Sequence, residues 1–427
     1  MMKLTNFFCI SILTGCLIGF QGSCAHSTSL LAGSPKPAVT ATSPAPDPSE
    51  ERGRLVASAL VATYTAEELQ KRYSRRDLPV KTGVEVHRIV YRTGVPFRPG
   101  EMTDASGVIV YPTGDHGTQS VLPWLSLQHG TITGDEEAPS AHLGYGLAEG
   151  SQGFVTAVQD YIGYGASRHL FHPYMIADTY VDSGIDMLRA TRMFVRSKGH
   201  DVGPLFLQGY SEGGYATMAL QRAIEEHYGH EFSLTASAPA AGPYDLVITS
   251  KVLAGKQKAS PVNLPFVVLS YDHWFRQEPP LWDLSQVLRN PPGEMYQLFD
   301  GRHASRQIYE MLPHETLGLF HENFIQDTVQ DAPQTVPGRL LRRWLTQESL
   351  TNKGWSPKTP TRIYHCIDDT VVPIEAAKSA WTTFKDLQPA APVEAVFIVS
   401  PDPQNPYDHG NCPVFLRSLT WLASFKR

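Results

Sequence analysis

A serine between two glycines, in Gly209-Tyr210-Ser211-Glu212-Gly213, constrains the fold of this chain more than any other feature. The apolar run Pro204–Gly209 precedes it, and side chains at helical spacing follow it from Tyr215 to Ile224. A serine on a tight strand-to-helix turn has crowded backbone neighbours, so glycine is needed two residues to either side. Such a turn presents the hydroxyl at the carboxyl end of a parallel sheet, in front of a helix N-terminus. The pattern therefore predicts an α/β sheet that carries a nucleophilic serine at its edge.

The rest of the chain alternates short apolar runs with helical patterns, as α/β proteins do. We predict strands at Val84–Tyr91, Ser106–Tyr111, Val121–Gln128, Phe154–Gln159, Pro204–Gly209, Leu234–Ala238, Arg362–His365 and Glu394–Val399. The first two are expected to pair antiparallel, and the third and fourth are apolar enough for buried central strands. Helices are predicted over Asp182–Arg196 and Val414–Phe425. The expected fold class is α/β, with a mostly parallel, doubly wound sheet.

The strand pattern disappears between Asp245 and about Pro360. Proline-broken helical segments occupy this stretch, namely Leu284–Leu288, Tyr296–Phe299, Ser305–Leu312, Leu317–Thr328 and Arg339–Leu345. Long structureless loops are rare inside compact domains, so residues 246–360 are expected to form an inserted helical cap, or lid. The core would then consist of residues 54–245 and 361–427. An independent second domain is the alternative, although both flanks of the stretch belong to one sheet.

The N-terminal residues are typical of an export signal. Met1-Met2-Lys3 is followed by an uncharged apolar run from Phe7 to Phe20, which is shorter than the roughly 20 residues that a membrane span needs. Cleavage after Ser23-Cys24-Ala25 would remove residues 1–25 and release a soluble protein. Alternatively, Leu13-Thr14-Gly15-Cys16 resembles a bacterial lipobox, whose Cys16 would be lipidated and attached to a membrane surface. We expect an exported protein, either secreted, periplasmic or held at the cell surface.

Residues 26–53 are dominated by Pro, Ser, Thr and Ala, as in Ser43-Pro44-Ala45-Pro46. With so few large apolar groups, this stretch cannot offset its own ordering entropy, and it is predicted to be a flexible linker.

Charge and motif content exclude several classes of function. The chain has 36 basic and 42 acidic residues, which leave a formal charge of −6. Because basic residues are not in excess over acidic ones, a nucleic-acid partner is not expected. The sequence contains no H-E-x-x-H motif and no paired Cys/His ligand spacing. No metal and no other cofactor are therefore expected.

A serine hydroxyl needs a base, and the base needs an acid that orients it. In folds with this serine turn, the acid and then the histidine follow the serine along the chain. Two adjacent carboxylates, Asp368 and Asp369, follow a late predicted strand, and Asp369 is preferred because it directly precedes Thr-Val-Val-Pro. His409 lies after the last predicted strand and before the terminal helix, where the base is expected. His365, at the end of its own strand, is expected to be structural.

Two backbone amides are candidates for the oxyanion hole. One is the amide of Thr131, in His129-Gly130-Thr131 after the predicted strand at 121–128, where glycine allows a close backbone approach. The other is the amide of Glu212, the residue after the nucleophile. The side chain of Glu212 is expected to face solvent.

Taken in order, these segments resemble the α/β-hydrolase superfamily. Within it, the chain is similar to the secretory-lipase branch, which comprises fungal secretory lipases and related exported bacterial esterases. The resemblance covers residues 55–427 and is carried by Ile89–Arg92, Ala105–Pro112, Gln128–Thr131, Asp160–Gly165, His172–Tyr174, Gly209–Gly214, the Asp369 loop and His409. It implies an α/β-hydrolase fold with a Ser211–Asp369–His409 triad under a helical cap that shapes an acyl pocket. Asp160 matches a turn that is usually structural.

The function expected from these residues is an exported serine carboxylic ester hydrolase, a lipase or esterase, acting on small-molecule esters or lipids through an acyl-enzyme. A serine peptidase that cleaves short peptides with the same triad is one alternative. A non-catalytic surface binding protein on the same scaffold is another. The predicted cap carries no recognisable motif, so the substrate-binding residues stay unassigned. Its large side chains would either line an acyl tunnel or form core: Phe266, Trp274, Phe275, Trp282, Phe320, Phe324 and Trp344.

The chain has five cysteines, an awkward count for an exported protein. Three of them lie in the export segment: Cys9, Cys16 and Cys24. The other two, Cys366 and Cys412, lie three residues before Asp369 and three residues after His409. If these two residues belong to one triad, their loops are neighbours. A Cys366–Cys412 disulfide, suited to an oxidising compartment, is therefore predicted.

Overall fold

The computed structural model describes residues 51–74, 78–114, 120–276 and 282–426. The predicted signal at 1–25, its cysteines and most of the predicted linker at 26–53 lie outside these residues. Within the described ranges, no helix combines the length and the apolar character needed to cross a membrane.

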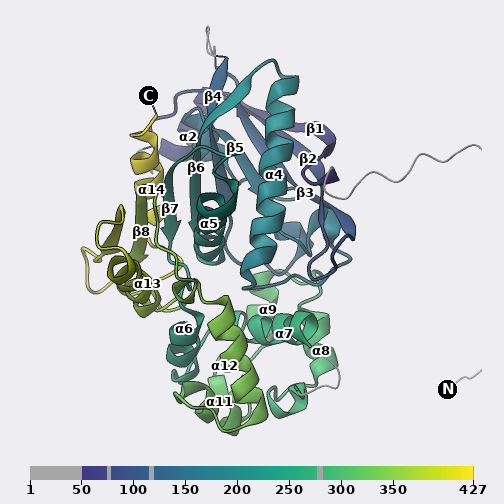
Figure 1. Ribbon diagram of the computed structural model, residues 1–427, viewed down its shortest axis with the longest axis vertical. Helices are drawn as coiled ribbons and strands as arrows, with labels where there is room; N and C mark the ends of the chain where they lie inside the picture. Colours follow the sequence, from purple (N-terminus) through teal and green to yellow (C-terminus); the bar gives the residue numbers. More distant parts are fainter. Residues whose placement is uncertain (1–50, 75–77, 115–119, 277–281, 427) are drawn as a thin grey trace, which may run out of the picture. The chain divides into compact units, whose positions relative to one another are not determined.

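In the described part of the chain, nine strands form one sheet in the order β1-β2-β3-β5-β4-β6-β7-β8-β9 (Figure 1). Their bounds are β1 Leu55–Tyr64, β2 Val84–Gly94, β3 Met102–Pro112, β4 Val121–Gln128, β5 Val155–Gln159, β6 Asp201–Tyr210, β7 Leu234–Ala240, β8 Thr361–Cys366 and β9 Val393–Ile398. Pairing is antiparallel from β1 through β3 to β5 and parallel from β5 to β9. The predicted α/β class with a mostly parallel sheet is confirmed.

Both faces of the sheet are covered by helices. In β6, Leu205 and Leu207 pack on one side with α4 (Ala177–Ser197), α5 (Glu212–Ala223) and α13 (Ile374–Leu387). The intervening Phe206 packs on the other side with α2 (Ala66–Tyr73), α3 (Leu147–Ser151) and α14 (Val414–Ala423). Since successive side chains of a strand point to opposite faces, a run of consecutive apolar residues feeds both cores.

The order of the strands reverses at β4, which has β5 on one side and β6 on the other. Gln128, at the end of β4, is in register with Gly209 near the end of β6. In open α/β sheets, functional sites form beside the carboxyl ends of strands at such a reversal. The loop after β4 and the turn after β6 therefore meet at one place.

The predicted opening antiparallel pair is in fact part of a three-stranded antiparallel edge. The strand β1 precedes the predicted pair, and the helix α2 follows β1. The sequence analysis missed β1 because most of its side chains are exposed on this edge of the sheet. No alternation between apolar and polar residues marks it.

Between β7 and β8, the chain forms helices and no strand in the residues that are described. We call residues 246–360 the helical insertion, and in Figure 1 its helices gather beyond one end of the sheet. The helices are α6 Leu246–Ala254, α7 Asn263–Phe275, α8 Pro292–Leu298, α9 Ser305–Met311, α10 Thr316–Leu319, α11 Glu322–Val329 and α12 Val336–Glu348. The boundaries predicted for the inserted cap stay a prediction.

Three details of the helical insertion differ from the predicted segments. The stretch expected at Leu317–Thr328 is two helices, α10 and α11, because the backbone is extended at Phe320 and His321. The segment expected at Leu284–Leu288 is a single 3₁₀ turn at Leu284–Gln286. α6 and α7 were not predicted, and in α7 every side chain from Leu264 to Asp272 is buried, so no helical period of burial appears.

One buried acid in the core lacks a partner. Glu149, in α3, is fully buried, and neither of its carboxylate oxygens has a hydrogen-bond partner among the described residues. Burial disfavours the charged form and raises the pKa of Glu149 from 4.5 to about 7.

This raised pKa predicts a dependence of stability on pH. Between pH 4.5 and 7, the folded state holds a proton on Glu149 that the unfolded state has lost, so the free energy of unfolding falls as pH rises through this window and levels off above it. Glu149→Gln removes this loss. Its stability relative to the wild type should increase by about 2 to 3 kcal/mol from pH 5 to pH 8, measured by urea unfolding.

The matched control is Glu136→Gln, at a solvent-exposed acid in the loop after β4. It should leave the pH dependence unchanged. A stability difference for Glu149→Gln that stays constant between pH 5 and pH 8 would contradict the assignment.

Candidate active site

The predicted nucleophile lies on a strained turn between β6 and α5. Ser211 has φ +62° and ψ −124°, in a region that residues other than glycine rarely adopt. A Cβ added at Gly209 would lie 2.2 Å from the carbonyl oxygen of Gly213. One added at Gly213 would lie 2.0 Å from the carbonyl oxygen of Gln128. No other residue fits either position without moving backbone, so the two glycines allow the turn to pack against the end of β4.

The structure brings Ser211, His409 and Asp369 together. His409 Nε2 lies 2.8 Å from Ser211 Oγ, and His409 Nδ1 lies 2.6 Å from Asp369 Oδ2. With a proton on Nδ1 bound by the carboxylate, Nε2 is left to accept the serine hydroxyl, which is the arrangement a general base requires. The competing Asp368 is exposed on the same loop, whereas Asp369 is buried.

The loop of Asp369 keeps this carboxylate ionised. Burial alone would raise the pKa of Asp369, but the hydrogen bond from His409, the nearby imidazoles of His409 and His365, and the amide of Val372 together bring it below its ordinary value. Its Oδ1 accepts hydrogen bonds from the amides of Val371 at 2.9 Å and Val372 at 2.8 Å. His365 is buried behind this loop, with Nε2 2.9 Å from the carbonyl oxygen of Val372.

The loop that carries His409 is fixed from two sides. The Tyr210 hydroxyl donates to the carbonyl oxygen of His409 at 2.6 Å, and its ring stacks on the imidazole with centroids 4.9 Å apart. A disulfide joins Cys366, at the end of β8, to Cys412, with a Cα–Cα distance of 6.0 Å. The acid loop and the base loop are therefore joined covalently within a few residues of the groups they carry.

The two residues predicted for the oxyanion hole lie beside the nucleophile. Gly130 is a neighbour of Ser211, and an added Cβ would lie 3.7 Å from Ser211 Cβ, in ordinary van der Waals contact. Thr131 lines an open cavity of about 490 Å³ together with Ser211 and His409. Within the described residues, the amide of Thr131 has no acceptor. The amide of Glu212 is the first of α5, where no intrahelical acceptor exists.

The expectation that the side chain of Glu212 faces solvent is wrong. Glu212 is 1% exposed, and its Oε1 accepts a hydrogen bond from the Tyr180 hydroxyl at 2.9 Å and lies 3.0 Å from His172 Nε2. Its Oε2 has no hydrogen-bond partner among the described residues. Position 212 is in the buried first turn of α5, and its partners come from α4 and from the loop before it. Sequence spacing alone gave no sign of these partners.

The partners of Glu212 are themselves held in place. His172 Nδ1 lies 2.7 Å from the carbonyl oxygen of Ile162, which can only accept, so Nδ1 donates to it. This bond orients the imidazole with Nε2 toward Glu212 Oε1. The buried acid is therefore enclosed by hydrogen-bonding groups from a second loop.

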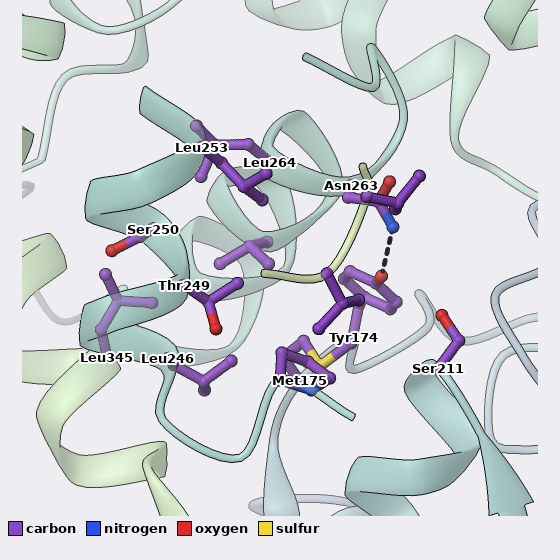
Figure 2. Close-up of a pocket in the computed structure, with 14 residues that line it drawn as sticks. Tyr174, Met175, Ser211, Leu246, Thr249, Ser250, Leu253, Asn263, Leu264 and Leu345 are labelled. Atoms are coloured by element: carbon purple, nitrogen blue, oxygen red, sulfur yellow. Dashed lines mark hydrogen bonds between the residues drawn. The ribbon is translucent and has the colours of Figure 1, made fainter. Parts of the chain in front are cut away.

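Ser211 also borders an apolar pocket that extends into the helical insertion (Figure 2). The pocket is narrow, about 40 Å³, which is room for roughly three or four water-sized groups. Its other lining residues are Tyr174, Met175, Pro243, Leu246, Thr249, Ser250, Leu253, Asn263, Leu264, Val267, Leu345, Val371 and Val372. The sequence analysis left these positions unassigned because it missed α6 and α7. None of the seven large side chains suggested for an acyl tunnel is among them.

Asp160 has a structural place in the site, as the sequence analysis expected. Asp160 is buried, and its carboxylate accepts hydrogen bonds from the Ser106 hydroxyl at 2.6 Å and from the Ser140 amide at 2.7 Å, so it ties together the loops after β4 and β5. Among the residues that the structure describes, no group of three or more His, Cys, Asp or Glu side chains is placed to hold a metal ion.

The disulfide predicts a linked loss of stability and activity. Replacing both Cys366 and Cys412 by serine removes a link that closes a sequence separation of 46 residues. We expect the free energy of unfolding to fall by about 2 to 4 kcal/mol. We also expect kcat to fall, because the base and the acid are no longer held in register. Thermal unfolding and ester hydrolysis measure the two effects.

A reductant should reproduce both effects in the wild type and have no further effect on the double variant. Full activity of the double variant at 25 °C would show that the disulfide does not hold the triad in place.

Comparison with known proteins agrees with this geometry. No protein-family model matches the sequence, and no curated protein matches it. The rice cell wall degrading esterase LipA from Xanthomonas oryzae is 26% identical with a TM-score of 0.72, over 88% of this chain and 96% of LipA.

Two more distant matches are informative about the fold alone. A candidate hydrolase from Legionella pneumophila is 23% identical with a TM-score of 0.75, over 87% of this chain and 98% of that protein. Candida antarctica lipase A is 16% identical with a TM-score of 0.56, over 86% of this chain and 82% of the lipase. From the sheet, the serine turn and these likenesses, we conclude that the chain belongs to the α/β-hydrolase superfamily.

Proposed function

We propose that the chain is an exported serine hydrolase that cleaves carboxylic esters through a covalent acyl-enzyme, in the manner of secretory lipases and exported esterases. The observation that carries the proposal is the unbroken hydrogen-bond line from Asp369 through His409 to Ser211, with an apolar pocket beside the serine. The likeness to the esterase LipA supports ester hydrolysis as the reaction class.

In the proposed reaction, Ser211 Oγ attacks the ester carbonyl while its proton passes to His409 Nε2. Asp369 stabilises the imidazolium, and the amides of Thr131 and Glu212 donate to the oxyanion. His409 then gives the proton to the leaving alcohol, which leaves an acyl group on Ser211. Water then attacks the acyl carbonyl while His409 takes a proton from it. His409 returns this proton to Ser211 Oγ as the carboxylic acid leaves.

The two cavities beside Ser211 differ in size, and this difference favours a particular substrate. The apolar pocket of about 40 Å³ accommodates only a short acyl group. The open cavity of about 490 Å³ on the other side accommodates a large alcohol. We therefore favour short-chain esters of a bulky alcohol over long-chain lipids. The similar protein LipA is a rice cell wall degrading esterase.

A peptidase with the same triad is less well supported. An aminopeptidase needs an acidic group near the nucleophile to hold the substrate's ammonium group. Neither cavity is lined by an Asp or Glu side chain within the described part of the chain.

Export rests on the sequence of the N-terminal segment and agrees with a disulfide in the catalytic core. Processing at Cys16 would attach the enzyme to a membrane surface, and processing after Ala25 would release it. The mass of the mature N-terminus distinguishes the two.

The first test removes the nucleophile. Ser211→Ala should fold normally and lose about 10⁴-fold or more of its turnover of p-nitrophenyl acetate. A fluorophosphonate should label the wild type but not the variant. Ser424→Ala, at an exposed serine after α14, is the matched control and should keep turnover and labelling. Undiminished turnover by Ser211→Ala would overturn the proposal, and faster cleavage of aminoacyl-arylamides than of esters would favour the peptidase.

A second test concerns the length of the acyl group. The wild type should prefer acetyl and butyryl p-nitrophenyl esters. Leu253→Ala, at the far end of the pocket in α6, should move the optimum to longer chains by removing side-chain volume there. Leu317→Ala, at an exposed leucine of α10, is the control and should leave the profile unchanged. Equal turnover of octanoyl and acetyl esters by the wild type would contradict the short-pocket assignment.

A further inference from the structure

Three polar side chains form a hydrogen-bonded line beside the nucleophile. Tyr174 Oη lies 2.9 Å from Thr131 Oγ1 and accepts a hydrogen bond from Asn263 Nδ2 at 3.0 Å, which Figure 2 shows as a dashed line. Thr131 follows β4, Tyr174 precedes α4, and Asn263 begins α7 of the helical insertion. Asn263, Tyr174 and Ser211 line one pocket, and Thr131, Asn263 and Ser211 line the other.

The central member of this line is rigidly held. Tyr174 is 1% exposed, and its ring stacks on Phe266 with centroids 4.6 Å apart and planes 10° from parallel. The stacked ring therefore fixes the hydroxyl oxygen between Thr131 and Asn263.

The chemistry of the three groups sets the direction of the bonds. An amide nitrogen only donates, so the Asn263 bond uses the Tyr174 oxygen as acceptor. The hydroxyl hydrogen of Tyr174 then needs an acceptor, because a buried donor left unpaired costs on the order of 1 to 3 kcal/mol. Thr131 Oγ1 is the acceptor within reach among the described residues. Thr131 thus accepts from Tyr174 and keeps its own hydroxyl hydrogen for another partner.

No described group other than Tyr174 is bonded to Thr131 Oγ1. The neighbouring Gly130 packs against Ser211, and Thr131 itself lines the cavity that holds Ser211 and His409. We infer that the Thr131 hydroxyl is a third oxyanion donor, beside the amides of Thr131 and Glu212, and that Asn263 fixes its orientation through Tyr174. Thr131 would act on the reacting atoms through its side chain, and Tyr174 and Asn263 would be positioning residues. This inference rests on the proposed function.

The consequence is that a residue of the helical insertion influences the chemical step. Asn263 polarises the Tyr174 hydroxyl, which in turn polarises the Thr131 hydroxyl, and hydrogen bonds in such a chain strengthen one another. The negative charge on the substrate oxygen develops mainly in the transition state, so the third donor should contribute to kcat more than to KM.

The first experiment replaces the threonine hydroxyl by a methyl group. Thr131→Val keeps the amide and the shape, and should lower kcat for p-nitrophenyl acetate roughly 10- to 100-fold with KM within about twofold of the wild type. Thr131→Ser, which keeps the hydroxyl, should retain most of the activity. A trifluoromethyl ketone, which forms a tetrahedral oxyanion on the serine, should bind Thr131→Val more weakly by the same factor as the loss in kcat/KM.

The second experiment reverses the donor and acceptor roles along the three residues and leaves the sequence of the oxyanion loop unchanged. In Asn263→Asp the carboxylate only accepts, so Tyr174 donates to it, Thr131 donates to Tyr174, and the Thr131 hydrogen is withdrawn from the site. We expect a loss close to that of Thr131→Val. In Asn263→Leu no donor sets the direction of the bond between Tyr174 and Thr131, so either hydroxyl can donate, and kcat should lie between that of the wild type and that of Asn263→Asp.

A double variant with both Thr131→Val and Asn263→Asp separates the effect of hydrogen-bond direction from the effect of the added negative charge. If the direction of the line is the cause, Asn263→Asp should cost nothing further in the Thr131→Val background. A full additional loss there, or wild-type kcat in Thr131→Val, would overturn the inference. Neither result affects the proposed function, which depends on the loss of turnover in Ser211→Ala. Thermal unfolding of each variant checks that it is folded.

Discussion

The close contact between the serine turn and the end of β4 is the constraint on which the rest of the site depends. The backbone at Gly213 lies against the carbonyl oxygen of Gln128 with no room for a side chain. The contact exists because β4 and β6 are parallel neighbours at the point where the strand order reverses. It aligns the loop that carries Thr131 with the first turn of α5. The two segments that carry the proposed oxyanion donors, Thr131 and Glu212, therefore lie side by side next to Ser211.

Asp369 and His409 are held in place by other means. Asp369 and His409 come from loops after β8 and β9, toward the edge of the sheet, where there are fewer neighbours to fix them. The Cys366–Cys412 disulfide and the stacking of Tyr210 on His409 supply that order. Both restraints limit the movement of the two loops, and the hydrogen bonds within the triad are short, at 2.6 and 2.8 Å.

The sequence was sufficient for features that leave a local pattern. The strand β4, Val121–Gln128, was predicted to the residue and β5 to within one residue, because buried parallel strands are continuous apolar runs, whereas β6 begins three residues before its predicted start. The serine turn was found because its glycines have no substitutes, and the structure brings the three residues of the predicted triad together. By contrast, β1 and α7 were missed because one is too exposed and the other too buried to show a period.

What the sequence could not supply were contacts between distant segments. Nothing local to Glu212 indicates that His172 and Tyr180 enclose its carboxylate, and nothing local to Asn263 indicates that it bonds to Tyr174. The lining of the apolar pocket depends equally on the packing of α6, α7 and α12. Substrate choice is therefore decided at the level of tertiary structure, in the part of the chain with the weakest sequence pattern.

The central claim is that Ser211 becomes acylated during turnover. Rapid mixing with p-nitrophenyl acetate, followed by acid quenching and peptide mass spectrometry, tests it directly. The account predicts a burst of p-nitrophenol approaching one equivalent per chain where deacylation is slow, and a single acetyl group on the peptide that contains Ser211. A chain that turns over the ester while its acetyl group is found on another residue would contradict the account.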